Sequence, residues 1–120
     1  MINHQAANIH SVSKALERCG ADVEITDSAA VLAAADGAVL PGVGANDTAM
    51  RALGELQLIE PIREFVRSGK PLLSVCLGMQ LLFSDSDEGE LPALGLVDGR
   101  VVLFDIDEPV DGGPRLKVPH

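Results

Sequence analysis

The order of apolar and polar segments in this chain predicts an α/β fold of three layers, with helices on both faces of a parallel sheet. Two short apolar runs, residues 38–40 and 71–75, are interpreted as strands. The first run does not alternate, which is typical of a strand that is buried on both faces. Segments with helical periodicity alternate with these runs. The length of 120 residues suits one domain.

The N-terminal third is predicted to begin with a helix over residues 8–19. Four apolar residues follow helical spacing there, namely Val12, Ala15, Leu16 and Cys19. The thiol of Cys19 is therefore expected to pack against the core. A strand over residues 23–26 and a short helix over residues 29–35 are expected next. Only two apolar residues precede the first helix, so the first strand of such a fold is predicted to be missing or severely shortened.

The middle of the chain is predicted to contain a glycine-rich turn and three helices. Residues 41–44, Pro-Gly-Val-Gly, are expected to break the strand before them, because two glycines permit angles that a side chain would block. One helix is expected to begin at Asn46 or Asp47, with Met50 and Leu53 pointing inward, and another from about Pro61. The third helix is placed over residues 79–83.

The C-terminal part is rich in acidic residues and is expected to form a solvated, loop-rich edge. Residues 94–104 are predicted to hold a strand or a hairpin around Asp98-Gly99. Residues 111–114 are interpreted as a loop, and a strand is expected to begin at residues 116–118.

The charge balance excludes several classes of partner. Nine basic residues stand against eighteen acidic ones, a formal charge of −9, which argues against binding nucleic acid or an anionic membrane surface. No apolar run approaches the roughly 20 residues of a membrane span, and residues 1–10 do not have the pattern of a signal peptide. Two cysteines cannot build a disulfide framework. We expect a cytoplasmic protein.

The sharpest local signal is the run from Ser74 to Gly78. An apolar strand leads into Cys76, a glycine follows two residues later, and a helix comes next. This is the layout of a nucleophile elbow, which presents a side chain at the carboxyl end of a sheet. The helix start behind Cys76 would favour the thiolate, and the N–H of Leu77 would donate to an oxyanion. The alternative is that Cys76 is a small apolar residue at a strand end.

The Pro41–Gly44 turn follows the other apolar strand and is therefore expected at the same edge of the sheet. Ligands of open parallel sheets bind at that edge. A second backbone N–H from this turn could face the same oxyanion, although an ordinary connection between a strand and a helix would also explain the glycines.

Together these segments resemble the class I, or triad-type, glutamine amidotransferases. Three runs carry the resemblance: LPGVGA at residues 40–45, GKPLL at 69–73 and CLGMQLLF at 76–83. The proline–glycine turn and the terminal Val-Pro-His are most similar to the glutaminase subunits of imidazole glycerol phosphate synthases, which belong to histidine biosynthesis. The resemblance implies a flavodoxin-like fold. It also implies that residues 1–120 form a partial domain, without the first strand and the C-terminal part.

The resemblance implies a role for each matching residue. Cys76 would attack the side-chain amide of glutamine, giving a glutamyl thioester and ammonia. The N–H of Leu77 and a flipped peptide at Val43-Gly44 would form the oxyanion hole. The bound glutamine would be held by Gly42 and Gln80, and Glu88 would help to bind its α-amino end.

The resemblance also implies a heterodimer with a cyclase subunit that is a (β/α)₈ barrel. The ammonia would pass to that subunit, which would convert a phosphorylated ribulosyl imidazole-carboxamide nucleotide into imidazole glycerol phosphate. Asn8 lies in the region that faces this partner in the family. No cofactor or metal is expected, because no His or Cys pair has ligand spacing.

The sequence departs from the family's pattern in its acid–base residues. The family uses a His two residues before a Glu as base and orienter, and no His-x-Glu occurs here, so we expect the chain as it stands to be inactive. His4 or His10 could replace the base only if a remnant first strand places them near the carboxyl edge. His120 is expected to be structural or to face the partner. Ser74 replaces a glycine that is usual in the elbow.

Three other functions remain open from the residues. The chain could be a class I amidotransferase that serves a different synthase. It could be a flavodoxin-like binding module without catalysis, in which case Cys76 would react no faster than an ordinary thiol. It could also be a cysteine hydrolase of the same elbow type that acts on an unrelated acyl substrate.

Overall fold

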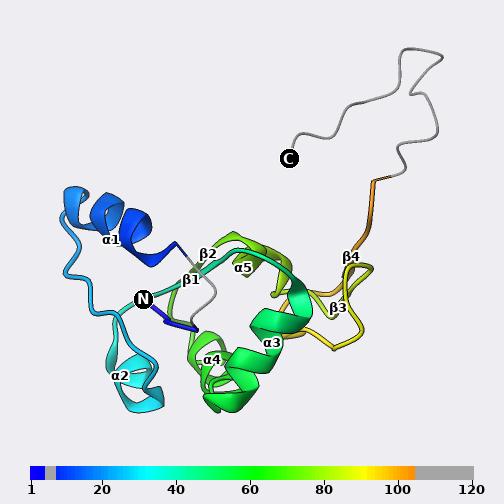
Figure 1. Cartoon of the computed structure of the whole chain (residues 1–120). Coiled ribbons are helices and arrows are strands. Elements are labelled where there is room, and N and C mark those ends of the chain that lie inside the picture. Colours follow the sequence, from blue (N-terminus) through cyan, green and yellow to red (C-terminus); the bar gives the residue numbers. More distant parts are fainter. Residues whose placement is uncertain (5–7, 105–120) are drawn as a thin grey trace, which may run out of the picture.

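The structure is a computed structural model that describes residues 1–4 and 8–104. Its elements, in chain order, are α1 (Ile9–Arg18), α2 (Ala29–Ala34), β1 (Ala38–Gly42), α3 (Asn46–Glu55), α4 (Ile59–Arg67), β2 (Leu72–Cys76), α5 (Leu77–Gln80), β3 (Asp85–Ser86) and β4 (Arg100–Val101). In Figure 1, α1 lies above the strands, and α2, α3 and α4 lie below them. The predicted α/β class with parallel pairing is confirmed.

The central strands pair in parallel at the predicted positions. The register of β1 and β2 runs from Ala38 opposite Leu72 to Gly42 opposite Cys76. The predicted break before Pro41 is wrong, because β1 continues through Pro41 and Gly42. A proline keeps a φ that suits an extended backbone and lacks only the N–H donor.

The N-terminal residues continue this pairing on the other side of β1. The N–H of Ile2 donates to the carbonyl oxygen of Val39 at 2.9 Å, and Ile2 forms a parallel bridge with Thr26. The first strand is thus shortened to one bridging residue. The predicted strand over residues 23–26 is wrong, since Thr26 alone of these four residues joins a bridge.

The core lies between β1, the helices α3 and α4, and the chain that follows α5. Its large aliphatic side chains that are fully buried are Ile2, Leu40, Leu53, Leu58, Ile62, Leu81 and Leu94. The inward positions predicted for α3 are confirmed, because Met50 and Leu53 are buried. Helix α4 buries Ile62 and Phe65, as its apolar spacing predicts. Helix α2 packs on α4, and α5 packs on both β1 and β2.

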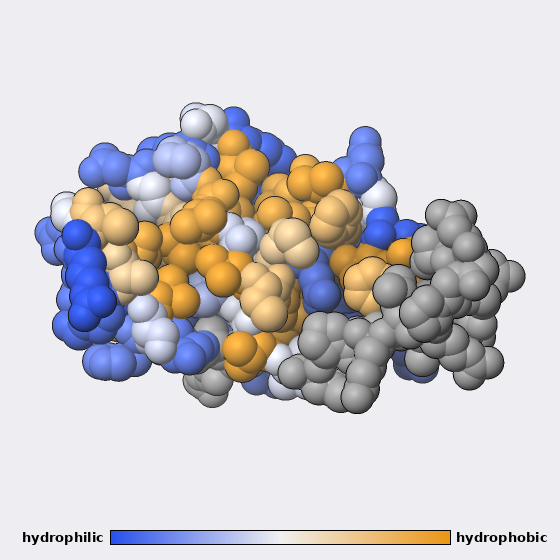
Figure 2. Space-filling model, turned by 90° about the horizontal axis from the view of Figure 1, so that it is seen from above, coloured by the Kyte–Doolittle hydropathy of each residue, from blue (hydrophilic) through white to orange (hydrophobic). Residues whose placement is uncertain are grey.

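Part of the apolar surface is not covered. On β2, Leu73 is 54% exposed and Val75 is 37% exposed. Figure 2, which views the molecule from above, shows apolar side chains gathered across that face. The expectation that Cys19 packs against the core is wrong: it is the C-cap of α1 and is exposed, because the helix ends there.

The region after α5 differs from its prediction. The helix expected over residues 79–83 starts at Leu77 and ends at Gln80. Of the strand or hairpin predicted over residues 94–104, the strand is confirmed as β4, and the hairpin around Asp98-Gly99 is wrong, because β4 pairs in parallel with β3. The elements expected at residues 111–118 lie outside the described residues. Among the described residues, none of the helices is long and apolar enough to span a membrane.

Candidate active site

The candidate nucleophile stands at the junction of β2 and α5. Cys76 is the last residue of β2 and the N-cap of α5, and its thiol is exposed. Its backbone has φ +56° and ψ −122°. A residue with a side chain rarely adopts a positive φ, and such strain is concentrated at functional sites. The sharp strand-to-helix turn predicted from the sequence is therefore present, and the role of Cys76 as a nucleophile stays a prediction.

Two glycines allow the elbow to sit against the end of β1. A Cβ on Gly78 would lie 2.0 Å from the carbonyl oxygen of Leu40, and a Cβ on Gly42 would lie 2.7 Å from the nitrogen of Gly78. The two backbones thus approach each other where no side chain fits. Gly42 was expected to hold substrate, and the structure places it opposite Cys76.

The predicted oxyanion donors lie on either side of this contact. The side chain of Leu77 is buried, and its N–H is one of the first four of α5, which have no partner inside the helix. On the β1 side, Val43 is 49% exposed and Gly44 has φ +91°. A Cβ on Gly44 would meet nothing within 4 Å, so the turn is open on that side.

The predicted substrate residues lie on two different segments. Gln80 is half-buried at the end of α5, one helical turn after Leu77. Glu88 is exposed on the loop that follows β3, where its N–H donates to Ser86 Oγ at 3.1 Å. Asn8 is exposed as the N-cap of α1, and its side chain accepts the N–H of Ser11.

The two histidines that the structure describes are not placed as a general base beside the thiol of Cys76 would be. His4 is fully buried, and its Nε2 lies 2.6 Å from the carbonyl oxygen of Pro41, so this nitrogen carries the proton. Since Pro41 pairs with Val75, His4 lies across β1 from β2. His10 is exposed on α1, and His120 lies outside the described residues. Among those residues, no three His, Cys, Asp or Glu side chains form a group that could hold a metal ion.

Two polar side chains have contacts or surroundings that the sequence did not reveal. The Oγ of Ser74, in the elbow, is buried without a hydrogen-bond partner in the described part of the chain. Asp47, which was interpreted only as a helix start, accepts the backbone N–H groups of Glu90 and Leu91. The signal in the sequence was an acidic residue in a first helical turn, which does not reveal such distant partners.

Comparison with known proteins gives a family match over most of the chain. The profile of the SNO glutamine amidotransferase family matches residues 4–103. A subunit of imidazole glycerol phosphate synthase, HisH of Synechococcus elongatus, is 45% identical over 120 residues, which are 100% of this chain and 52% of the relative. HisH of Gloeobacter violaceus is 44% identical, again over 100% of this chain and 50% of the relative. The chain thus spans about half the length of the curated relatives that it matches.

Proposed function

The chain belongs to the SNO glutamine amidotransferase family, as its motifs predicted, and from this premise we propose that it supplies the nucleophile of a glutaminase. The observation that carries the proposal is Cys76, an exposed thiol on a residue with φ +56° at the carboxyl end of a parallel strand. A side chain held in such a conformation is typical of an elbow that presents a nucleophile to substrate.

The proposed reaction begins at the thiolate of Cys76. Its sulfur attacks the side-chain carbonyl carbon of glutamine, and the C=O electrons move to the oxygen. The tetrahedral intermediate collapses, the C–N bond breaks, and the nitrogen leaves as ammonia after taking up a proton. Water then hydrolyses the thioester, which yields glutamate and returns the thiol.

The surrounding residues have roles that follow from their positions. The N–H of Leu77 stabilises the oxyanion, because it is unpaired within α5 and adjoins the nucleophile. The Val43-Gly44 peptide supplies the second donor after rotating in its open turn. Gly42 and Gln80 hold the glutamine, and Glu88 binds its α-ammonium group.

Proton transfer needs a group beyond those in the described site. His4 is engaged with the carbonyl oxygen of Pro41, on the far side of β1. No His-x-Glu pair occurs in the 120 residues. We therefore expect covalent capture of a glutamine analogue by this chain, and no turnover of glutamine by the chain as it stands.

The proposal includes a pathway and a partner. The relatives at about 45% identity are named as subunits of imidazole glycerol phosphate synthase, and we propose the same assembly here. The ammonia then serves a (β/α)₈-barrel cyclase subunit in histidine biosynthesis, in the cytoplasm, and the surface around Asn8 faces that subunit.

The decisive experiment measures ammonia release from glutamine by two proteins. One is this chain, and the other is a chimera that continues it with the remaining length of the Synechococcus elongatus relative. Both are assayed with the cyclase subunit and its nucleotide, with Cys76→Ala as control. We expect release by the chimera only, and none after Cys76→Ala.

Two outcomes would contradict the proposal. Activity that survives Cys76→Ala would remove the cysteine from the mechanism. A folded chimera that forms no ammonia, and whose Cys76 reacts with iodoacetamide no faster than a free thiol, would favour the binding module without catalysis.

A further inference from the structure

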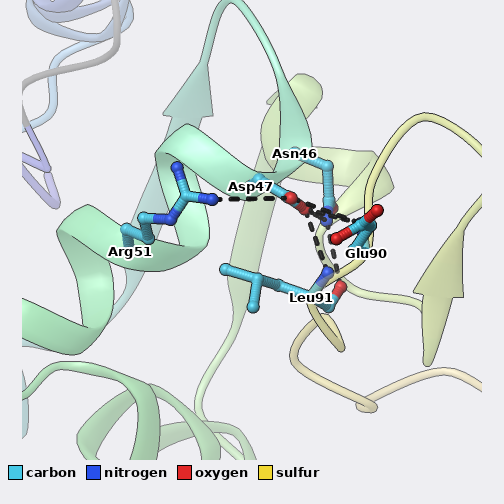
Figure 3. Close-up of polar contacts among 5 residues, drawn as sticks. All are labelled: Asn46, Asp47, Arg51, Glu90 and Leu91. Carbon is cyan, nitrogen blue, oxygen red and sulfur yellow. Dashed lines mark hydrogen bonds and ion pairs between the residues drawn. The ribbon is translucent and has the colours of Figure 1, made fainter.

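The carboxylate of Asp47 holds a loop that is distant in sequence. Its Oδ1 accepts the N–H of Glu90 at 3.0 Å and the N–H of Leu91 at 3.1 Å (Figure 3). The neighbouring Asn46 donates from Nδ2 to the carbonyl oxygen of Leu91 at 3.3 Å. Both backbone groups of Leu91 are therefore bound by the start of α3.

The loop passes so close to this carboxylate that a side chain would not fit between them. A Cβ on Gly89 would lie 2.2 Å from Oδ1 of Asp47. The loop thus rests on the carboxylate over consecutive residues, from Gly89 to Leu91. A contact of this extent fixes a loop more firmly than one hydrogen bond does.

Electrostatics strengthen the contact. The hydrogen bond from the N–H of Leu91 is the largest cause that holds the pKa of Asp47 below its ordinary value of 3.8. Arg51, one turn later on α3, lies 3.8 Å from Oδ2. The carboxylate is therefore ionised at neutral pH, and hydrogen bonds to an ionised acceptor are about twice as strong as neutral ones.

The same loop carries Glu88, which lies between two anchors. On one side, the N–H groups of Glu88 and Gly89 donate to Ser86, to its Oγ at 3.1 Å and its carbonyl oxygen at 3.2 Å. On the other side stands Asp47. Asp47 also follows the Val43-Gly44 turn by three residues, so it links that turn to the loop.

We propose that Asp47 is a positioning residue of this site, which holds the Glu88 loop against the start of α3 and thereby sets the affinity for ligands with the amino-acid end of glutamine. The inference rests on the proposed function, in which Glu88 binds the α-ammonium group. It predicts that loss of the Asp47 carboxylate weakens ligand binding without slowing the chemistry of Cys76.

The test uses two reagents that alkylate Cys76, in a Cys19→Ser background so that the second exposed thiol does not react. The first is a diazo-ketone analogue of glutamine. The sulfur bonds to its terminal carbon, that carbon takes up a proton, and N₂ leaves. The second is iodoacetamide, which loses iodide and has no amino-acid end. Mass spectrometry follows both rates as a function of reagent concentration.

The parent chain should show saturation with the diazo-ketone and protection by glutamine. Asp47→Ala should raise the half-saturating concentration roughly tenfold, the effect expected from losing charge-assisted hydrogen bonds. Asp47→Asn, which keeps one acceptor oxygen, should give a smaller increase. The limiting rate and the iodoacetamide rate should stay unchanged. The matched control Arg51→Gln removes the ion pair but keeps the loop contacts, and should resemble the parent.

The outcomes separate this inference from the proposed function. If glutamine does not protect the parent, the proposed function fails and this inference fails with it. A second outcome is that glutamine protects the parent while Asp47→Asn and Asp47→Ala show the same half-saturating concentration of the diazo-ketone as the parent. In that case only the positioning role of Asp47 is overturned. A parallel fall of the iodoacetamide rate would also overturn it, because the change would then act on the elbow itself. Should Asp47→Ala not fold, Asp47→Asn decides.

Discussion

The two turns at the carboxyl edge of β1 and β2 contribute to the same candidate site, yet they are built differently. The turn after β2 is closed, because a Cβ on Gly78 would lie 2.0 Å from the carbonyl oxygen of Leu40. The turn after β1 is open, because a Cβ on Gly44 would meet nothing within 4 Å. The closed turn requires Gly78 because there is no space for a side chain, whereas the open turn requires Gly44 only because of its positive φ.

This difference matches the roles that we propose for the turns. A nucleophile benefits from a rigid position, which the contact between Gly78 and β1 provides. An oxyanion donor that rotates into place needs open space around its turn, and there is open space beside Gly44. Substitutions should therefore disturb folding strongly in the closed turn and weakly in the open one.

The largest effect is expected for Gly78→Ala. The new methyl group would meet a backbone carbonyl, which cannot turn aside as a side chain can. We expect the free energy of unfolding to fall by about 3 kcal/mol or more, measured by urea denaturation. The control is Gly54→Ala in α3, whose Cβ would meet its nearest atom at 3.8 Å. Equal stability of the two variants would show that the closed turn can accommodate a methyl group.

A smaller loss is expected for Gly44→Ala in the open turn. The methyl group has space, but alanine at φ +91° is disfavoured. We expect a loss of about 1–2 kcal/mol in the same measurement. Gly44→Asn should lose less, because asparagine tolerates positive φ better. A loss as large as that of Gly78→Ala would contradict the distinction between the turns.

Removing the backbone strain at Cys76 is expected to raise the free energy of unfolding. Cys76→Ala and Cys76→Gly both delete the thiol, but only glycine adopts φ +56° easily. We expect the glycine variant to be more stable than the alanine variant by about 1 kcal/mol, since part of the relief is offset by the flexibility of glycine when unfolded. Equal or greater stability of the alanine variant would mean that the elbow is unstrained.

The smallest expected effect is a pH dependence of the free energy of unfolding. It comes from the carboxylate of Asp47, which lies just after the open turn. The pKa of Asp47 is lowered from 3.8, mainly by the N–H of Leu91, and the charged groups near it are Arg51 and Glu90. A folded-state pKa below the unfolded one gives stability that is complete above the unfolded value and is lost as pH falls through the folded value. The stability difference between the parent and Asp47→Asn should be constant near neutral pH and shrink below about 3.8. A difference that does not change with pH would show that the ionised form is not what holds the loop.

The sequence by itself determined the features that depend on near neighbours. The first helix, the inward Met50 and Leu53, and the sharp turn at Cys76 all follow from short spacings. Such features are set by backbone angles and by helical or strand periodicity, which a few adjacent residues express. For the same reason the family could be inferred from the runs around the two turns.

The tertiary structure alone decided the contacts between distant segments. Three features join elements many residues apart: the parallel pairing of β3 with β4, the hydrogen bond from His4 to Pro41 and the loop held by Asp47. A fourth, the exposure of Cys19, depends on the end of α1 that no other described segment covers. Helical periodicity placed Cys19 on an apolar face, but it does not predict how much of that face another segment covers. The 2.0 Å approach at Gly78 likewise needs the end of β1 beside the elbow. A local pattern predicts an element and its apolar face, whereas the position of each side chain depends on which distant backbone packs there.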